Sequence, residues 1–576
     1  MAETVFQTEI LVNLIFDNLE MKDKINLSLC NKKINSFFNK RPKILKTSID
    51  IPHRDYLQTI EIPLLNKIFS KYKNIKKMKT LFNSNKKLNN ILDLNLVSNL
   101  EILEIKCIVS NIDIIKNFIN LKELNLYWNY QQQDEVTNLS FLSNLVNLEK
   151  LTLRDGKVTG IESIKGLVKL KELYIFYIKI GNNMENVNYS GCSFFGSISK
   201  ANYLDITPIS YLSNLEKMDL YDLINSIEPI KLLKNLREIN LSIKISDLSI
   251  FSNFTNLNKL NVRGEIKSIE PIVYLSNLEE LKMRSEVDIA DISLISNLIN
   301  LKILDINFPG FTDISPLSNL TNLKKINLEK TNIINIESMK YLINLEELNL
   351  YKEHNEKLTD ISPLSKLFNL KKLNLGSNNI RDIKPIKSLI NLKKLDLSGN
   401  GALSDITPLS FLINLENLDI RFTKITSIEP LKELIKLKKL DLSFNNISDI
   451  SALALLVNLN DLRLISLSLT NIDHLKGLIN LKKLDLSYNY GISDISPLCL
   501  MFNLEELYLR ELNITNLEPI KNLIYLEELN LYGNENLSDI SPLSKLIYLR
   551  ELYVGKTRVT NFEPVNGFKR LLIHKY

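Results

Sequence analysis

Six aromatic residues between Leu121 and Tyr221 are the side chains best suited to chemistry in this sequence. They are Tyr127, Trp128, Tyr174, Phe176, Tyr177 and Tyr221, and Trp128 is the only tryptophan among 576 residues. Their chemistry would be noncovalent, because exposed aromatic rings are enriched among the residues that dominate binding at protein interfaces. We therefore predict that these six residues bind a target protein.

Catalytic and metal-binding chemistry find little support in the sequence. The four histidines, His53, His354, His474 and His574, do not stand in the spacing of a metal site or a catalytic triad. Neither of the glycine-rich phosphate-binding patterns occurs. We expect no enzyme activity, no cofactor and no metal.

Regular strand-like units must position the aromatic residues. The stretch from Asn391 to Ile413 shows one unit: Leu392, Leu395 and Leu397 alternate with polar residues, as side chains on one face of a strand do. Asn400 follows at a turn, and Thr407 and Pro408 suit an N-cap and the first helical position. The L-x-x-L-x-L pattern recurs from Leu100 onward, mostly every 21 to 23 residues.

This period with this pattern resembles the leucine-rich repeat, in the 22-residue form of the phosphatase-regulator and internalin groups. The resemblance implies an α/β solenoid of about 20 repeats over residues 100–576. Its parallel sheet would lie on the concave side, and short helical turns would lie on the convex side. Asparagine or threonine at the turn should satisfy buried backbone groups. The residues at this position are Asn129, Asn378, Asn400, Asn445, Asn489, Asn534, Thr331, Thr423 and Thr557.

An alternation on the helical side locates one insertion. Ser-Pro or Thr-Pro pairs alternate with Glu-Pro or Lys-Pro pairs, so the full period is about 45 residues. By this alternation the 45 residues from Leu170 to Leu215 hold one repeat with an insertion near 178–203. Insertions often fall on the binding face. The insertion either frames the aromatic residues for a target or folds back and covers them.

The rest of the concave face is predicted to be polar. Asn327, Asn349, Asn374, Asp396, Asp419, Asp441 and Asp485 occupy equivalent strand positions. Lys-Lys and Glu-Glu pairs flank them and are expected to provide solubility and pairing between strands.

Residues 1–45 carry a second resemblance. The segment T-E-I-L-x-x-x-I-F-x-x-L, followed by D-K-I-N-L-S-L-C-N-K-K-I, resembles the F-box, which docks substrate receptors onto the adaptor of cullin ubiquitin ligases. The family's opening Leu-Pro is replaced by Phe6-Gln7, and its later Trp by Ile34. The resemblance implies that the adaptor-binding residues are Ile10, Leu11, Ile15, Phe16, Leu19 and Leu27. The alternative is a helical cap on the open end of the solenoid.

Residues 46–99 form a lysine-rich lead-in, which we interpret as degenerate first repeats and not as a nucleic-acid patch. The net charge of +6, from 72 basic and 66 acidic residues, is too balanced to indicate nucleic acid. Cys30, Cys107, Cys192 and Cys499 lack C-x-x-C spacing and read as free thiols. With neither a signal peptide nor a membrane span predicted, we expect a cytoplasmic protein that is monomeric apart from its partners.

Taken together, the sequence resembles F-box/leucine-rich-repeat receptors, and its composition resembles such proteins from giant DNA viruses of amoebae. The implied function is that of a substrate receptor of a cullin-type ubiquitin ligase, which binds the adaptor at one end and an unidentified target at the other. The alternative is a standalone scaffold resembling a phosphatase regulator. A secreted adhesin of the internalin type ranks third, because no signal peptide is predicted.

Overall fold

The structure is a computed structural model that describes residues 49–50, 77–81, 100–108, 112–128, 136–180, 204–221, 224, 226–243, 245–352 and 358–575. The chain divides into two compact units, Met1–Gly264 and Glu265–Tyr576. The F-box-like residues and most of the lead-in lie outside the described residues. Within the described part, no helix is both long and apolar enough to cross a membrane.

The first unit is built on a parallel sheet in which the described strands pair in the order β1-β2-β3-β4-β6-β8-β10-β11-β12. A small second sheet pairs β5, β7 and β9. The strands are β1 Ile49–Asp50, β2 Lys77–Leu81, β3 Ile102–Ile108, β4 Glu123–Trp128, β5 Thr137–Asn138, β6 Lys150–Arg154, β7 Lys157–Thr159, β8 Glu172–Phe176, β9 Lys179–Ile180, β10 Lys217–Tyr221, β11 Glu238–Ser242 and β12 Lys259–Gly264. The 3-10 helices are η4 Asp113–Asn117, η5 Ser140–Asn144, η6 Ile161–Gly166, η7 Thr207–Tyr211, η8 Glu228–Leu232 and η9 Ser249–Asn253.

The second unit repeats the same arrangement with shorter strands, each paired with the next from β13 to β26. The strands are β13 Glu280–Ser285, β14 Ile303–Asn307, β15 Lys325–Asn327, β16 Glu347–Asn349, β17 Lys372–Asn374, β18 Lys394–Asp396, β19 Asn417–Asp419, β20 Lys439–Asp441, β21 Asp461–Arg463, β22 Lys483–Asp485, β23 Glu506–Tyr508, β24 Glu528–Asn530, β25 Glu551–Tyr553 and β26 Leu572–His574.

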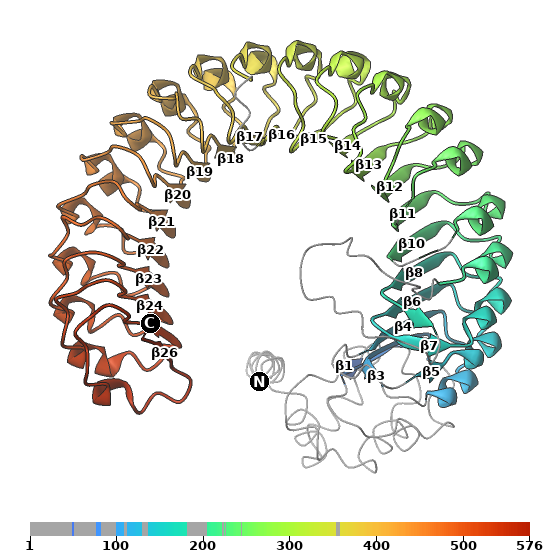
Figure 1. Cartoon of the computed structure of the whole chain (residues 1–576), viewed down its shortest axis with the longest axis horizontal. Helices are drawn as coiled ribbons and strands as arrows, with labels where there is room; N and C mark the ends of the chain where they lie inside the picture. The colour runs from blue at the N-terminus through green and yellow to red at the C-terminus, as the bar shows by residue number, and fades with distance from the viewer. Residues whose placement is uncertain are drawn as a thin grey trace, which may run out of the picture. The chain divides into compact units, whose positions relative to one another are not determined.

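Short 3-10 helices alternate with these strands. They are η10 Glu270–Tyr274, η11 Ser293–Asn297, η12 Ser315–Asn319, η13 Glu337–Tyr341, η14 Ser362–Lys366, η15 Lys384–Ser388, η16 Thr407–Phe411, η17 Glu429–Glu433, η18 Ser451–Leu455, η19 Asp473–Leu475, η20 Ser496–Leu498, η21 Glu518–Ile520, η22 Ser541–Lys545 and η23 Glu563–Val565. Figure 1 shows the strands of this unit along the inner side of an arc and the helices along the outer side. The predicted leucine-rich-repeat solenoid is confirmed, with 3-10 helices as its convex elements.

The core lies between the sheet and the 3-10 helices. In the repeat that opens at Leu392, the side chains of Leu392, Leu397 and Leu409 are fully buried, and that of Leu395 is 2% exposed. The other described repeats bury leucine or another apolar side chain, such as Met283 or Ile306, at the same positions, so each repeat buries its apolar face only against its neighbours. This is why the array can extend without a central globular core.

The turn asparagines within the described residues act as predicted, whereas Asn129 lies outside them. Asn400 is fully buried; its Nδ2 donates to the carbonyls of Leu375 (3.0 Å) and Leu397 (2.8 Å), and its Oδ1 accepts from the Ile380 N–H at 3.0 Å. Thr423 fills the equivalent position with fewer hydrogen bonds of its own, because its hydroxyl has a single proton to donate, either to Asn445 Oδ1 at 2.6 Å or to the Ile420 carbonyl at 3.1 Å. These side chains satisfy backbone groups that the turn leaves inside the solenoid.

The predicted N-cap role of Thr407 is wrong. Helix η16 already includes Thr407, and its N-cap residue is Ile406. The side chain that satisfies the first N–H belongs to Asp405, whose Oδ1 accepts from the Thr407 N–H at 2.9 Å. The Asp two residues before the helix forms an Asx turn, which competes effectively with a hydroxyl cap because a carboxylate is the stronger acceptor.

Candidate target-binding surfaces

The aromatic residues of the first unit lie on neighbouring strands of its sheet. Tyr127 on β4 is in register with Arg154 on β6, Arg154 with Phe176 on β8, and Phe176 with Tyr221 on β10. We call these four residues the aromatic column. The rings of Phe176 and Tyr221 are 5.8 Å apart, and the Arg154 guanidinium lies 5.7 Å from the Phe176 ring. Strand pairing therefore assembles residues up to 94 positions apart into one continuous surface.

Lysine side chains lie over the rings of Tyr127 and Tyr174. Lys106 Nζ lies 5.6 Å from the centre of the Tyr127 ring, and Lys150 Nζ lies 5.5 Å from the centre of the Tyr174 ring. Tyr174 donates a hydrogen bond to Glu172 Oε2 at 3.1 Å. Burial first, and then the charge of Glu172, raises the pKa of the Tyr174 hydroxyl, so this hydroxyl remains protonated and able to donate.

The prediction that Trp128 faces solvent is wrong. Its side chain is 8% exposed, and its Nε1 donates to Thr137 Oγ1 at 2.8 Å. Successive strand side chains point to opposite faces, so Tyr127 faces outward while Leu126 and Trp128 on either side of it face inward. Gly156 makes room for the indole: a Cβ added there would lie 2.5 Å from Trp128 Cδ2. Trp128 therefore supports the surface from beneath and cannot contact a target directly.

Tyr177 borders the aromatic column at the end of β8. Its side chain is 38% exposed, its backbone has φ of 54°, and its N–H donates to the Tyr221 carbonyl at 2.9 Å. The left-handed conformation costs free energy for a bulky residue, so the backbone here is fixed by its surroundings. The structure thus brings together five of the six predicted residues. Residues 181–203 of the insertion lie outside the described residues, so both interpretations of the insertion stand.

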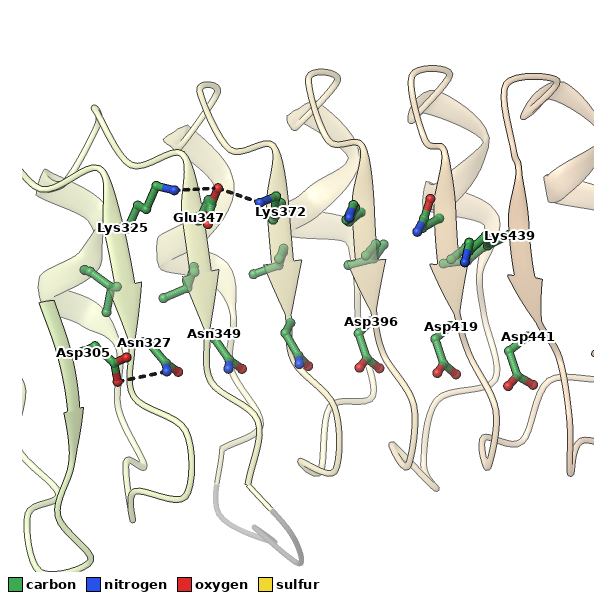
Figure 2. A pocket seen from close by; sticks show the side chains of 18 of the residues that line it. Asp305, Lys325, Asn327, Glu347, Asn349, Lys372, Asp396, Asp419, Lys439 and Asp441 are labelled. Atoms are coloured by element: carbon green, nitrogen blue, oxygen red, sulfur yellow. Dashed lines mark hydrogen bonds and ion pairs between the residues drawn. The ribbon is translucent and has the colours of Figure 1, made fainter. Parts of the chain in front are cut away.

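The second unit carries a different surface, an open groove of about 720 Å³ on its strands. Figure 2 shows two rows of labelled polar side chains crossing it. In one row Glu347 bridges Lys325 at 3.1 Å and Lys372 at 2.8 Å. The predicted pairing of lysines and glutamates between strands is confirmed by such contacts, which recur along the unit.

The other row becomes acidic toward the C-terminus. Asp396, Asp419 and Asp441 are in register on β18, β19 and β20. Burial, followed by the charges of Asp396 and Asp441, raises the pKa of Asp419 to about 7. Arg421 opposes this shift, with its Nε 3.3 Å from Asp419 Oδ2. The sequence predicted only that this row is polar; three aspartates at one position in consecutive repeats were the signal for a charged groove.

Both surfaces are suited to noncovalent recognition. The aromatic column offers rings and a guanidinium on a rigid sheet, and the groove offers paired charges. Across the described residues, no group of three or more His, Cys, Asp or Glu side chains is arranged to hold a metal ion. The predicted adaptor-binding residues, Ile10 to Leu27, lie outside the described residues.

Comparisons with known proteins agree with the repeat architecture. Residues 369–410 and 413–455 match the family model described as Leucine Rich repeats (2 copies). No curated protein matches the sequence significantly. The chain is similar to an internalin (inlF) from Listeria monocytogenes, with 32% identity over 57% of this chain and 88% of the internalin, at a TM-score of 0.48. It is also similar to InlJ from Listeria monocytogenes, with 20% identity over 62% and 73% of the two chains, at a TM-score of 0.45. It is similar to the plant peptide hormone receptor RGFR1 as well, with 18% identity over 92% of this chain and 87% of the receptor chain, at a TM-score of 0.49.

Proposed function

Since the chain is a leucine-rich-repeat protein, we propose that it is a non-enzymatic interaction protein that captures a protein target on the aromatic column. The observation that carries this proposal is a continuous outward-facing set fixed by strand pairing, in which Tyr127, Phe176 and Tyr221 are half-buried and Arg154 is exposed. Tyr and Arg are enriched at interface hot spots, and a preformed surface loses little conformational entropy on binding.

The finer part of the proposal concerns residues 1–45. We propose that they act as an F-box, so that the chain is a substrate receptor of a cullin-type ubiquitin ligase inside the cell. The quoted motif around Ile10, Phe16 and Leu27 supports this. In this arrangement the N-terminal segment binds the adaptor and the strands present the target to the ligase.

Target capture is tested with the full chain carrying Phe176→Ser and Tyr221→Ser together. The bound proteins are quantified by mass spectrometry after affinity purification. We expect at least about tenfold lower recovery of the target, because each ring removed from a hot spot typically costs 2 kcal/mol or more. The matched control is Tyr490→Ser, which removes a 62% exposed ring from the second unit. Equal recovery from the double variant and the wild type would contradict the proposal.

Adaptor binding is tested separately with Phe16→Asp, and Phe69→Asp in the lead-in is the control. We expect the wild type and the control to retain the cullin adaptor and Phe16→Asp to lose it, while all three retain the target. A wild-type chain that retains the target without the adaptor would favour the standalone scaffold.

A further inference from the structure

An apolar ridge runs along one flank of the second unit. The residue two positions before the first leucine of the L-x-x-L-x-L pattern is apolar in each of the ten repeats from Ile343 to Ile547. All ten side chains are exposed, from 42% at Ile524 to 65% at Ile547. They lie where the chain passes from the outer helix to the inner strand, as Ile413 does between Phe411 at the end of η16 and Asn417 at the start of β19. We call these ten residues the flank ridge.

The backbone of the flank ridge is held rigidly from repeat to repeat. An asparagine follows seven of the ten ridge residues, and six of these asparagines donate Nδ2 to the ridge carbonyl of the preceding repeat. Asn391 donates to Phe368 at 2.8 Å, for example, and Asn414 donates to Ile390 at 2.9 Å. Beside the ridge, Tyr525 and Tyr548 each follow a ridge residue directly, and their rings stack with centres 6.3 Å apart. The ridge is therefore one continuous preformed surface.

Its area is that of an interface. Half-exposed side chains of this size leave roughly 50–100 Å² each open to water, so ten leave on the order of 500–1,000 Å². A monomer rarely exposes so large a contiguous apolar patch, and a standard interface buries about 800 Å² per partner. Lys436 is the only charged residue directly following a ridge residue, and its Nζ donates to Asn414 Oδ1 at 2.6 Å. Little charge on the ridge would oppose association.

A row of charged residues borders the ridge, at the position three residues after the ridge residue of each repeat. The order of positive and negative charges along this row is self-complementary. A two-fold axis between Ile435 and Val457 reverses the repeat order and superposes the ridge on itself. It then places opposite charges of the two copies together: Glu346 with Arg550, Lys371 with Glu527, Lys393 with Glu505 and Glu416 with Lys482. All four charged pairs are opposite in sign, and the fifth pair joins Lys438 to the neutral Asn460. Each of these eight charged side chains also forms an ion pair with a neighbouring repeat of its own chain, as Lys371 Nζ does with Glu346 Oε2 at 2.6 Å, so the second copy would add a partner to an existing pair. An apolar centre with a polar, charge-matched rim is the anatomy of an isologous dimer interface.

We propose that the flank ridge binds the flank ridge of a second copy of this chain in this two-fold register. The proposal departs from the monomer expected from the sequence and is independent of target capture. Dimerisation joins two chains flank to flank and leaves the strand face of each second unit open.

Sedimentation velocity of the full chain over a concentration series tests the proposal. We expect a dimer of the wild type and of Thr321→Glu, the matched control, because Thr321 occupies the same repeat position just before the ridge. Ile435→Glu with Val457→Glu should weaken the dimer by at least about tenfold. A wild-type chain that stays monomeric, or that instead binds phospholipid vesicles through the ridge, would overturn the proposal, as would a ridge variant that dimerises like the wild type.

The register is tested by charge reversal. Lys371→Glu and Glu527→Lys should each weaken the dimer, and the two together should restore it, because the two-fold axis pairs these positions. Circular dichroism of each variant shows that it is folded. Failure of the double variant to recover would overturn the two-fold register.

Discussion

Asp419 makes the stability of the second unit depend on pH in an unusual direction. An aspartate is ordinarily ionised above a pKa of 3.8, but burial and the neighbouring carboxylates of Asp396 and Asp441 raise the pKa of Asp419 to about 7. Because the folded state holds this proton more tightly than the unfolded state, the contribution of Asp419 to stability is fully present below pH 3.8. It is lost as the pH rises through about 7. The wild type should therefore lose stability between pH 4 and pH 8 at this site.

Asp419→Asn removes this effect with little change of shape. The difference between a pKa of 3.8 and one of about 7 corresponds to on the order of 4 kcal/mol at pH 8. Asn can still accept the Arg421 N–H, which lies 3.2 Å from Asp419 Oδ1, and Arg421 keeps Asp441 Oδ2 at 3.8 Å as an ion-pair partner. We expect the variant to unfold at a higher urea concentration than the wild type at pH 8 and at an equal concentration near pH 4.

The assay is urea unfolding followed by circular dichroism at pH 4, 6 and 8, with wild type and variant compared at each pH. The gain should grow with pH across this range. A variant that is less stable than the wild type at pH 8, or whose difference from it does not change with pH, would refute the reasoning that the carboxylate of Asp419 is ionised at a cost.

Three further predictions concern single positions. Asp405→Asn should lower the thermal midpoint at pH 7 and not at pH 3, because hydrogen bonds from Thr407 lower the pKa of Asp405 and its stabilisation is lost only as the pH falls below 3.8; equal loss at both pH values would contradict this. Asn400→Ala should lower the free energy of unfolding, measured by urea unfolding, by about 2–5 kcal/mol, and Asn400→Thr should lower it by less, because a threonine can retain one hydrogen bond; equal losses would argue against the role of the side-chain amide. Gly156→Ala should destabilise the first unit by about 1–3 kcal/mol and shift the fluorescence of Trp128, whereas unchanged emission would mean that the indole does not lie against Gly156.

The repeated elements were predictable because one short pattern determines each of them. Leucines at fixed spacing produced the strands, and the asparagine at the turn had one physical task, which the hydrogen bonds of Asn400 confirm. The inward direction of Trp128 was also available, since it follows Leu126 by two residues and a strand has a period of two. The sequence prediction placed the whole aromatic set on one face and overlooked this alternation.

Other features depend on neighbours that the sequence does not place. The pKa of Asp419 follows from burial between β18 and β20, which only the packed strands create. The flank ridge escaped notice because one isoleucine before an Asn-Leu pair is an unremarkable loop residue. Its meaning appears only when ten equivalent positions are seen to be exposed together. The cap of η16 likewise depends on Asp405, an acceptor two residues before the Thr407 that the sequence prediction made the N-cap.

In the proposed function, the strand face of the first unit captures a protein target. The most direct measurement places a photo-crosslinking amino acid at position 176 of the full chain, and in a parallel sample at Asn349 in the groove of the second unit, followed by mass spectrometry of the crosslinked products. Crosslinking of one target protein from position 176, and not from position 349, is the result that we predict. The same target crosslinking only from position 349, or no protein crosslinking from position 176, would contradict the claim.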